Sequence, residues 1–379
     1  MKRITTVFVF AAMLVIAGSC GKDLSEDCVF TAHTENILAN KTGSATRMQT
    51  EDMKAVKWSE GDKIKVFKAS EIKSADAQGM DFTLTGAAGT PSAQFTAAGS
   101  GAFNKSKSYA VYPAGIVKGH DGTVVKVELP AVQHYVAGSF APEGFASVAT
   151  GSSKEEMLFQ NLCGVLILKL TNSTKQFSIA SLSIVTKGEE SISGAGSVDF
   201  NYKETPELVM AAPASDAQKT VKLVCDPPVQ LGSSATSFCF AIPAGKLANG
   251  FTLYVNDELY GQMVLDGPVN KNTIFRSESR TIASSITYVP TAVNPETTLK
   301  GLAVAYRTAA SVQVPLITGT NNGWKVYWGD GSSDDYSPLL EHTYLNPSET
   351  VSVYYNFENI QSFSFQSLTG IETIYVTNL

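Results

Sequence analysis

The sequence predicts an all-β protein built from β-sandwiches, and three observations support this fold class. Short runs of β-branched and aromatic residues recur throughout the 379 residues, and clusters of Gly, Pro, Asn, Asp and Ser separate these runs. No segment carries a long apolar stripe at the period of a helix. The expected strands are 63–67, 81–86, 92–97, 109–113, 124–130, 164–171, 221–226, 238–243, 251–257 and 262–267.

The N-terminus has the features of a bacterial export signal. Residues 1–3 include two basic residues, residues 4–16 are mostly apolar, and small residues lead to Cys20. This order is typical of a signal peptide over residues 1–19, and the apolar run is too short to span a bilayer. The small residues before the cysteine resemble a lipobox, which predicts that Cys20 is acylated and anchors the chain in the outer membrane, at the cell surface. The alternative is an ordinary signal peptide with an incidental cysteine.

The charge balance argues against nucleic acid as a partner. Removal of residues 1–19 takes away two of the 29 basic residues and none of the 35 acidic ones, which leaves 27 basic residues and a formal charge of −8. Binding to phosphates needs clustered Lys and Arg, and the chain has no basic run.

Breaks in the strand rhythm divide the chain into a series of segments. After the signal comes a polar tether with a first strand, followed by two sandwich domains, a linker with two prolines and a smaller C-terminal β domain. The expected segments are 20–54 (tether and first strand at 28–34), 55–150, 151–287, 288–298 (linker) and 299–379.

Four cysteines remain after Cys20, and none has a spacing typical of a zinc site. Cys163 lies in an apolar run and is expected in a core, as a small hydrophobic residue. Cys225 and Cys239 flank an expected hairpin, so they either form a disulfide or remain buried thiols on neighbouring strands. We favour the thiols.

The motifs of the first two domains resemble those of the fimbrillin (Mfa-like) family of Bacteroidetes surface lipoproteins. Their order and spacing carry the resemblance, which covers roughly residues 25–285. The matching segments are 46–48, 56–67, 109–113, 129–133 and 159–164. The resemblance implies two stacked transthyretin-like sandwiches.

The family also implies a way of assembling. In polymerising members a protease removes the first strand after an arginine, and a strand of a neighbouring subunit fills the groove by β-strand addition. Arg47 is the matching residue here, and 28–34 is the strand that would leave. The alternative is that Arg47 is a surface loop residue and the first strand stays in place. We favour this alternative, because many family members are tips, anchors or accessory proteins.

Gly61 and Asp62 follow Trp58 in the first of these motifs. We interpret the pair as a tight turn ahead of a strand, with Trp58 filling the space behind it. An aspartate beside a glycine can also serve as a catalytic acid, but turns use this pair far more often.

The C-terminal unit resembles a polycystic-kidney-disease (PKD) type sandwich. The resemblance rests on Trp328 followed by Gly329, Asp330 and Gly331, and on the later segment 341–344 with its His-x-Tyr pattern. The glycines are expected to form a turn, against which the histidine and tyrosine pack. The glycine usual after this pattern is absent.

Asp330 lies near Asp334 and Asp335, so this loop could hold calcium. The spacing of an EF-hand is missing, and we favour a solvated hairpin. The last twenty residues resemble a single leucine-rich unit, and one such unit cannot form a solenoid. We expect this tail to supply one or two closing strands.

No motif predicts catalysis, a cofactor or a metal site. The four histidines are scattered, and the chain has no G-x-S-x-G, H-E-x-x-H or phosphate-binding loop. The paired glutamates at 155–156 and 189–190 are expected to be exposed, whereas a glycosidase needs two carboxylates facing each other across a cleft.

Two functions remain as hypotheses. The first is adhesion, or service as a fimbrial tip, anchor or accessory subunit, with other fimbrial subunits and host or bacterial surface ligands as partners. The second is glycan binding for polysaccharide uptake, through an exposed aromatic platform. The candidate platform residues are Tyr327, Tyr336, Tyr354 and Tyr355.

Overall fold

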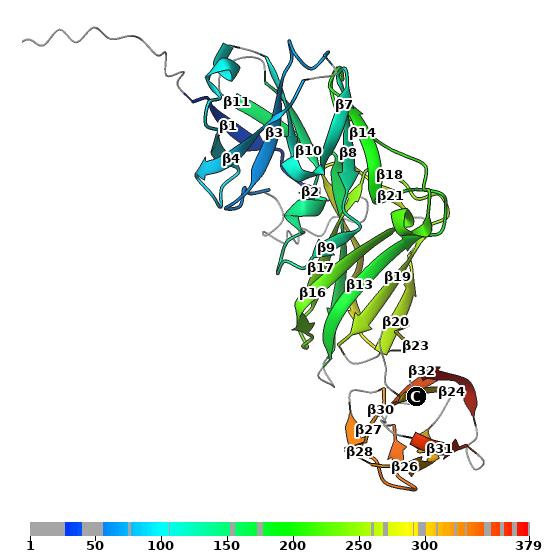
Figure 1. Ribbon diagram of the computed structural model, residues 1–379. Coiled ribbons are helices and arrows are strands. Elements are labelled where there is room, and N and C mark those ends of the chain that lie inside the picture. Colours follow the sequence, from blue (N-terminus) through cyan, green and yellow to red (C-terminus); the bar gives the residue numbers. More distant parts are fainter. Residues whose placement is uncertain are drawn as a thin grey trace, which may run out of the picture.

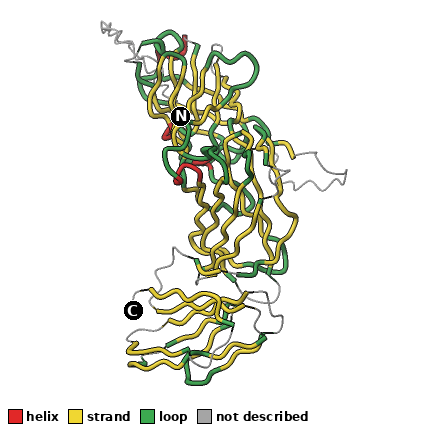
Figure 2. The backbone as a smooth tube through the Cα atoms, turned by 90° about the vertical axis from the view of Figure 1, so that its right-hand side faces the viewer, coloured by secondary structure: helices red, strands yellow, loops and turns green. Residues whose placement is uncertain are grey.

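The computed structural model describes residues 27–39, 56–74, 77–105, 107–151, 156–172, 177–258, 261–267, 272–290, 292–294, 301–307, 310–321, 324–329, 332–344, 350–356, 360–365 and 370–377. Strands dominate these residues (Figures 1 and 2), which confirms the all-β prediction. The helical elements among them are short 3-10 turns: η2 (Gly101–Lys105), η3 (Ala114–Ile116), η4 (Pro142–Gly144) and η5 (Asp216–Lys219). None of the described helices is long and apolar enough to cross a membrane.

The N-terminal part of the chain forms a closed seven-stranded barrel. Around the barrel the strand order is β1, β11, β10, β6, β3, β4 and β5. Phe82, Phe95 and Phe159 fill its core from alternate positions along their strands, as a sheet with one buried face requires. The barrel strands are β1 (Val29–Thr34), β3 (Lys63–Lys68), β4 (Met80–Gly86), β5 (Ser92–Thr96), β6 (Ser108–Tyr112), β10 (Ser147–Gly151) and β11 (Glu156–Asn161).

A two-layer sandwich follows the barrel along the molecule (Figure 1). One layer has the strand order β17, β12, β22, β2, and the other has β23, β20, β19, β13, β16, β9. Leu168, Leu182, Phe238 and Leu253 meet in the core between the layers. The strands are β2 (Leu38–Ala39), β9 (Val132–His134), β12 (Cys163–Thr171), β13 (Ser178–Thr186), β16 (Thr220–Gln230), β17 (Thr236–Pro243), β19 (Phe251–Asp257), β20 (Gly261–Asp266), β22 (Glu278–Thr287) and β23 (Ala292–Val293).

Strand pairing crosses the expected division at residue 150. β11 follows that residue but belongs to the barrel, while β9 precedes it and pairs with β16 of the sandwich. A further sheet has the strand order β15, β14, β8 and β7, so it combines strands from before and after residue 150. The remaining strands are β7 (Val117–Asp121), β8 (Val124–Leu129), β14 (Gly194–Asp199), β15 (Leu208–Met210) and the small pair β18 (Gly245–Lys246) and β21 (Thr273–Ile274).

The C-terminal unit has its own core, in which Val304, Trp328, Val353 and Tyr355 are buried. Its largest sheet has the order β28, β27, β30, β24, β32, and the tail supplies β31 and β32, which confirms the expected closing strands. In the predicted linker, β23 pairs with β20. The strands of the unit are β24 (Gly301–Arg307), β25 (Ser311–Gln313), β26 (Leu316–Gly319), β27 (Lys325–Tyr327), β28 (Ser333–Asp335), β29 (Glu341–Thr343), β30 (Thr350–Asn356), β31 (Ile360–Ser364) and β32 (Ile371–Thr377).

The hairpin expected around Cys225 and Cys239 is wrong. β16 and β17 are consecutive in the chain, but they lie in different layers of the sandwich. The two cysteines therefore point into different core clusters, and both are thiols, as is Cys163. Burial raises the pKa of all three thiols to about 12.

These raised pKa values lead to a prediction on thiol reactivity. At pH 8 only about one in 10⁴ of such thiols is ionised, and burial also shields them, so a thiol reagent should label Cys163, Cys225 and Cys239 only after unfolding. Labelling in buffer and in concentrated urea, read by mass spectrometry, measures this. A pair that stays unreactive in urea until a reductant is added would instead show a disulfide.

Candidate functional site at the first strand

The first strand closes the barrel and is bonded on both sides. β1 pairs antiparallel with β5 and parallel with β11. Cys28, Phe30 and Ala32 point inward and are buried, and the ring of Phe30 lies edge-on to that of Phe82 at 5.0 Å between centroids. Apolar residues at every second position direct this segment into the sheet, because successive side chains of a strand face opposite sides. The first strand predicted at 28–34 is confirmed.

Trp58 holds the middle of β1 from inside the barrel. Its indole nitrogen donates a hydrogen bond to the carbonyl oxygen of Ala32 at 3.0 Å. Its ring is 2% exposed and makes edge contacts with Phe95, Tyr112 and Phe159 at 4.9–5.2 Å. Trp58 therefore joins β1 to the opposite wall of the barrel.

Behind Trp58 the chain turns at Gly61, whose φ of +85° suits a residue without a Cβ. Asp62 accepts hydrogen bonds from the backbone N–H of Ser59 at 2.7 Å and from the hydroxyl of Tyr112 at 2.9 Å. Burial raises the pKa of the Asp62 carboxyl. These contacts give Asp62 a structural position in the turn.

The raised pKa of Asp62 leads to a prediction on pH dependence. A group that binds its proton more tightly in the folded state adds stability below its unfolded pKa, and this contribution is lost as the pH rises through the folded pKa. Asp62→Asn cannot titrate, so the stability of the wild type relative to this variant should fall from pH 3 upward until the folded pKa is passed. Urea unfolding of both proteins at a series of pH values measures the difference, and parallel curves would contradict the prediction.

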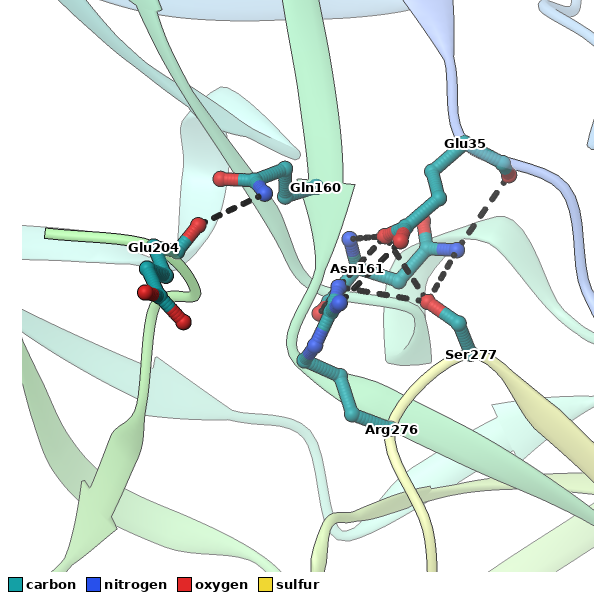
Figure 3. A network of polar contacts seen from close by, with 6 residues as sticks. All are labelled: Glu35, Gln160, Asn161, Glu204, Arg276 and Ser277. Atoms are coloured by element: carbon teal, nitrogen blue, oxygen red, sulfur yellow. Dashed lines mark hydrogen bonds and ion pairs between the residues drawn. The ribbon is translucent and has the colours of Figure 1, made fainter. Parts of the chain in front are cut away.

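A polar network fixes the chain just after β1 (Figure 3). The Glu35 carboxylate forms an ion pair with the Arg276 guanidinium, with Nη2 to Oε1 at 3.1 Å. Its Oε2 also accepts hydrogen bonds from the Ser277 hydroxyl at 2.8 Å and the Asn161 backbone N–H at 2.9 Å. The side chains of Glu35 and Arg276 are 27% and 22% exposed, so water screens this pair only in part.

Arg276 and Ser277, the partners of Glu35, lie in a tight turn between β21 and β22. Ser277 sits there at φ +57°, a left-handed conformation that is uncommon for a residue other than glycine. The turn lies directly against β12 at Gly164, where an added Cβ would collide with the carbonyl oxygen of Phe275. Arg276 also donates to the carbonyl oxygen of Asn161 at 3.0 Å. The packing of the turn against β12 and the hydrogen bond to Asn161 thus hold Arg276 in position.

The N-terminal segment continues past this network into the sandwich. Ile37 is buried in the core cluster shared by the barrel and the sandwich, and β2 pairs in parallel with β22. Residues 27–39 therefore contribute one strand to the barrel and another to a sandwich sheet.

A pocket of about 440 Å³ opens beside the end of β1. Aromatic residues line it, among them Trp58, Tyr112, Phe140 and Phe145, together with small polar residues and Lys57. The described lining contains no carboxylate, histidine or cysteine.

Several predicted site residues lie outside the described residues, namely Cys20, Arg47, Asp330 and Gly331. Acylation of Cys20 and cleavage after Arg47 stay predictions.

In the C-terminal unit, Gly329 adopts a φ of +75° directly after Trp328. The Trp328 ring stacks on that of His342 at 4.9 Å, and the Tyr344 hydroxyl donates to the Trp328 carbonyl oxygen at 2.7 Å. His342 and Tyr344 therefore pack on Trp328, and their predicted packing against the glycine turn stays a prediction, because Asp330 and Gly331 lie outside the described residues. The PKD-type resemblance itself stays a prediction.

Two of the three candidate calcium ligands have other partners. Asp334 accepts a hydrogen bond from the Trp328 indole at 2.7 Å, and Asp335 lies 3.6 Å from Lys325. Among the described residues there is no group of three or more side chains suited to hold a metal.

Two of the four candidate platform tyrosines are buried. Tyr336 is 8% exposed and Tyr355 is fully covered, so neither can stack on a sugar at the surface. Tyr327 is half-buried, and the Tyr354 side chain lies outside the description.

No motif in the sequence predicts the Glu35 network. Glu35 and Arg276 are separated by 241 positions, and neither belongs to a recognisable local motif. The only local signal is the interruption of the inward alternation after Ala32, where a charged residue follows the strand.

No family model and no curated protein matches the chain. Solved structures do resemble it. A candidate cell adhesion protein from Bacteroides ovatus has a TM-score of 0.40 at 12% identity, covering 71% of this chain and 94% of that one. A fimbrial protein from Bacteroides ovatus has a TM-score of 0.32 at 12% identity, covering 74% and 52%. A candidate cell adhesion protein from Bacteroides fragilis has a TM-score of 0.35 at 9% identity, covering 69% and 93%. Function therefore has to be inferred from the contacts of the chain itself.

Proposed function

We propose that this chain is a non-enzymatic surface lipoprotein, anchored through Cys20, that acts in adhesion or as a fimbrial tip, anchor or accessory subunit. Against the alternative that the sequence alone favours, we propose further that it joins neighbouring subunits by β-strand addition at the groove that its own first strand fills. The sequence resemblance described above supports this proposal, as does the absence of a catalytic motif from the sequence.

The observation that carries the proposal is the position of β1. A terminal strand completes a closed sheet, with hydrogen-bonded neighbours on both sides. Departure of β1 would leave β5 and β11 with open edges above a groove lined by Phe82, Trp58 and Phe95. An open edge above an apolar groove is the site at which a strand from another subunit adds.

Limited proteolysis tests the assembly mechanism. Trimming the mature chain with an arginine-specific protease should cut after Arg47 and produce a ladder of oligomers on denaturing gels. Arg47→Gln should prevent both results, and Lys41→Gln, a matched change in the same segment, should leave the oligomers unaffected. A chain that is trimmed without forming oligomers would exclude the polymerising role and leave the tip, anchor or accessory role.

Electron microscopy tests the cellular role. A labelled antibody against the C-terminal unit should decorate filaments, or filament bases and tips, on intact cells. A protein absent from filaments and from the cell surface would contradict the proposal.

A further inference from the structure

We infer that the corner formed by Arg276, Ser277 and the backbone N–H of Asn161 is a carboxylate receptor that selects the strand in the first-strand groove and sets its register. Glu35 of the same chain occupies this receptor in the structure. The inference rests on the proposed strand addition and identifies the incoming partner by chemistry. That partner is a strand with an inward aromatic residue, a small residue two positions later and a carboxylate three positions after that.

The need for such a receptor follows from the apolar part of the groove. Cys28, Phe30 and Ala32 lie two positions apart and all point inward. A strand displaced by two residues would therefore still place apolar side chains inward. Displacement by one residue is already excluded, because it would turn every apolar side chain outward. Backbone hydrogen bonds do not distinguish the remaining registers, since every residue offers the same groups.

A carboxylate distinguishes these registers well. A shift of two residues moves a side chain by about 7 Å along the strand, which breaks every contact that Glu35 makes in the receptor. Arg276 would then lack its partner in a site that is only partly open to water, at a large cost in free energy. The ion pair and two hydrogen bonds therefore favour a single register.

The small-residue position supports the same register. Ala32 is fully buried, and its carbonyl oxygen receives the Trp58 indole N–H at 3.0 Å. A strand shifted by two residues would bring the Phe30 ring to this covered position. The groove thus selects for size at one position and for charge at another.

Cys28 offers a direct measure of how firmly the strand is held. Its side chain is buried at the start of β1, so a thiol reagent reaches it when the strand opens. In the full mature chain carrying Cys20→Ser, Glu35→Gln should raise the native labelling rate of Cys28 roughly tenfold to a hundredfold, the range expected when hydrogen bonds to a charged group are lost. Asn36→Gln, a change at the adjacent exposed residue, should not, and labelling of Cys163 should stay unchanged in both variants.

Peptide exchange tests selectivity. A site for a specific protease is placed between residues 45 and 50 of the mature chain, which is then cut and mixed with labelled peptides of residues 27–39. The wild-type and Asn36→Gln peptides should bind equally well, and the Glu35→Gln peptide roughly tenfold to a hundredfold more weakly. A peptide carrying His33→Glu with Glu35→His, which moves the carboxylate by two positions, should bind as weakly as Glu35→Gln. On an Arg276→Gln protein the wild-type and Glu35→Gln peptides should become equal.

The outcomes separate the two proposals. If no peptide enters the cut protein, strand addition fails, and the inference fails with it. If peptides enter but the Glu35→Gln or the displaced-carboxylate peptide binds within twofold of the wild type, strand addition stands and the carboxylate receptor is overturned. An unchanged rate of Cys28 labelling in the intact Glu35→Gln chain would overturn the receptor as well.

Discussion

Replacing Trp58 with alanine is expected to lower the free energy of unfolding of the barrel by about 3–5 kcal/mol, the range measured when a buried aromatic side chain is cut back to alanine. The ring is almost fully covered and touches three other aromatic rings. Loss of each edge contact lowers the stability further, beyond the effect of the buried area. The truncation also removes the buried hydrogen bond that the indole N–H donates to the Ala32 carbonyl oxygen, which adds to the loss of stability.

The loss in the free energy of unfolding can be measured through Cys28, because its labelling in a urea series reports opening of the barrel. Trp58→Phe keeps an aromatic ring but removes the N–H donor, so it separates packing from the hydrogen bond. Trp328→Ala makes the same truncation in the core of the C-terminal unit and should leave Cys28 labelling unchanged. An equal effect of Trp58→Ala and Trp328→Ala on Cys28 would contradict an independent barrel core.

Replacing Arg276 with alanine is expected to cost about 2–3 kcal/mol. Removal of one partner from a fully buried ion pair costs about 3–5 kcal/mol, because the other charge is left uncompensated. The Glu35 carboxylate is partly exposed and retains its bonds to Asn161 and Ser277, so water and these donors should reduce the loss. The turn at Ser277 also loses the contact from Arg276 to the Asn161 carbonyl oxygen.

A double-mutant cycle with Glu35→Gln isolates the interaction between the two side chains. The double variant should be more stable than the sum of the single changes predicts, by about 1–2 kcal/mol. Arg280→Ala is a suitable control, since Arg280 lies on β22 and donates to the Thr273 carbonyl oxygen, whereas the Glu35 carboxylate contacts Arg276, Ser277 and Asn161. Strictly additive effects of Arg276 and Glu35 would show that their pairing contributes nothing to stability.

Local sequence patterns predicted a set of apolar strands, but they missed others, among them the long strands β13 and β22. Every strand expected from apolar alternation coincides with a strand of the structure, as β5 illustrates with Ala93 and Phe95 inward and Gln94 outward. Proline marks some strand ends, since β6 ends at Tyr112 before Pro113 and β8 ends at Leu129 before Pro130. β16, in contrast, continues through Pro227 and Pro228. These features follow from the periodicity and donor chemistry of a few neighbouring residues.

Pairing between strands was beyond such patterns. Met157 and Phe159 lie in the expected second domain, 151–287, yet they form β11 in the barrel, and the chain changes sheet at Leu162. The misassigned hairpin at Cys225 and Cys239 has the same origin. The period of a strand tells which side chains are buried, but it does not tell which sheet receives the strand.

The pairing of early strands with strands that come much later in the chain constrains how this protein can fold during synthesis. Chains emerge N-terminus first, and β8 and β9 both precede residue 135, whereas their partners β14 and β16 lie between residues 194 and 230. More than half of the polypeptide must therefore be available before the early strands can be covered. Until then their apolar edges are exposed to proteases and to other unfinished copies, so this topology favours delivery of an unfolded chain to its destination, with folding after the whole sandwich has arrived.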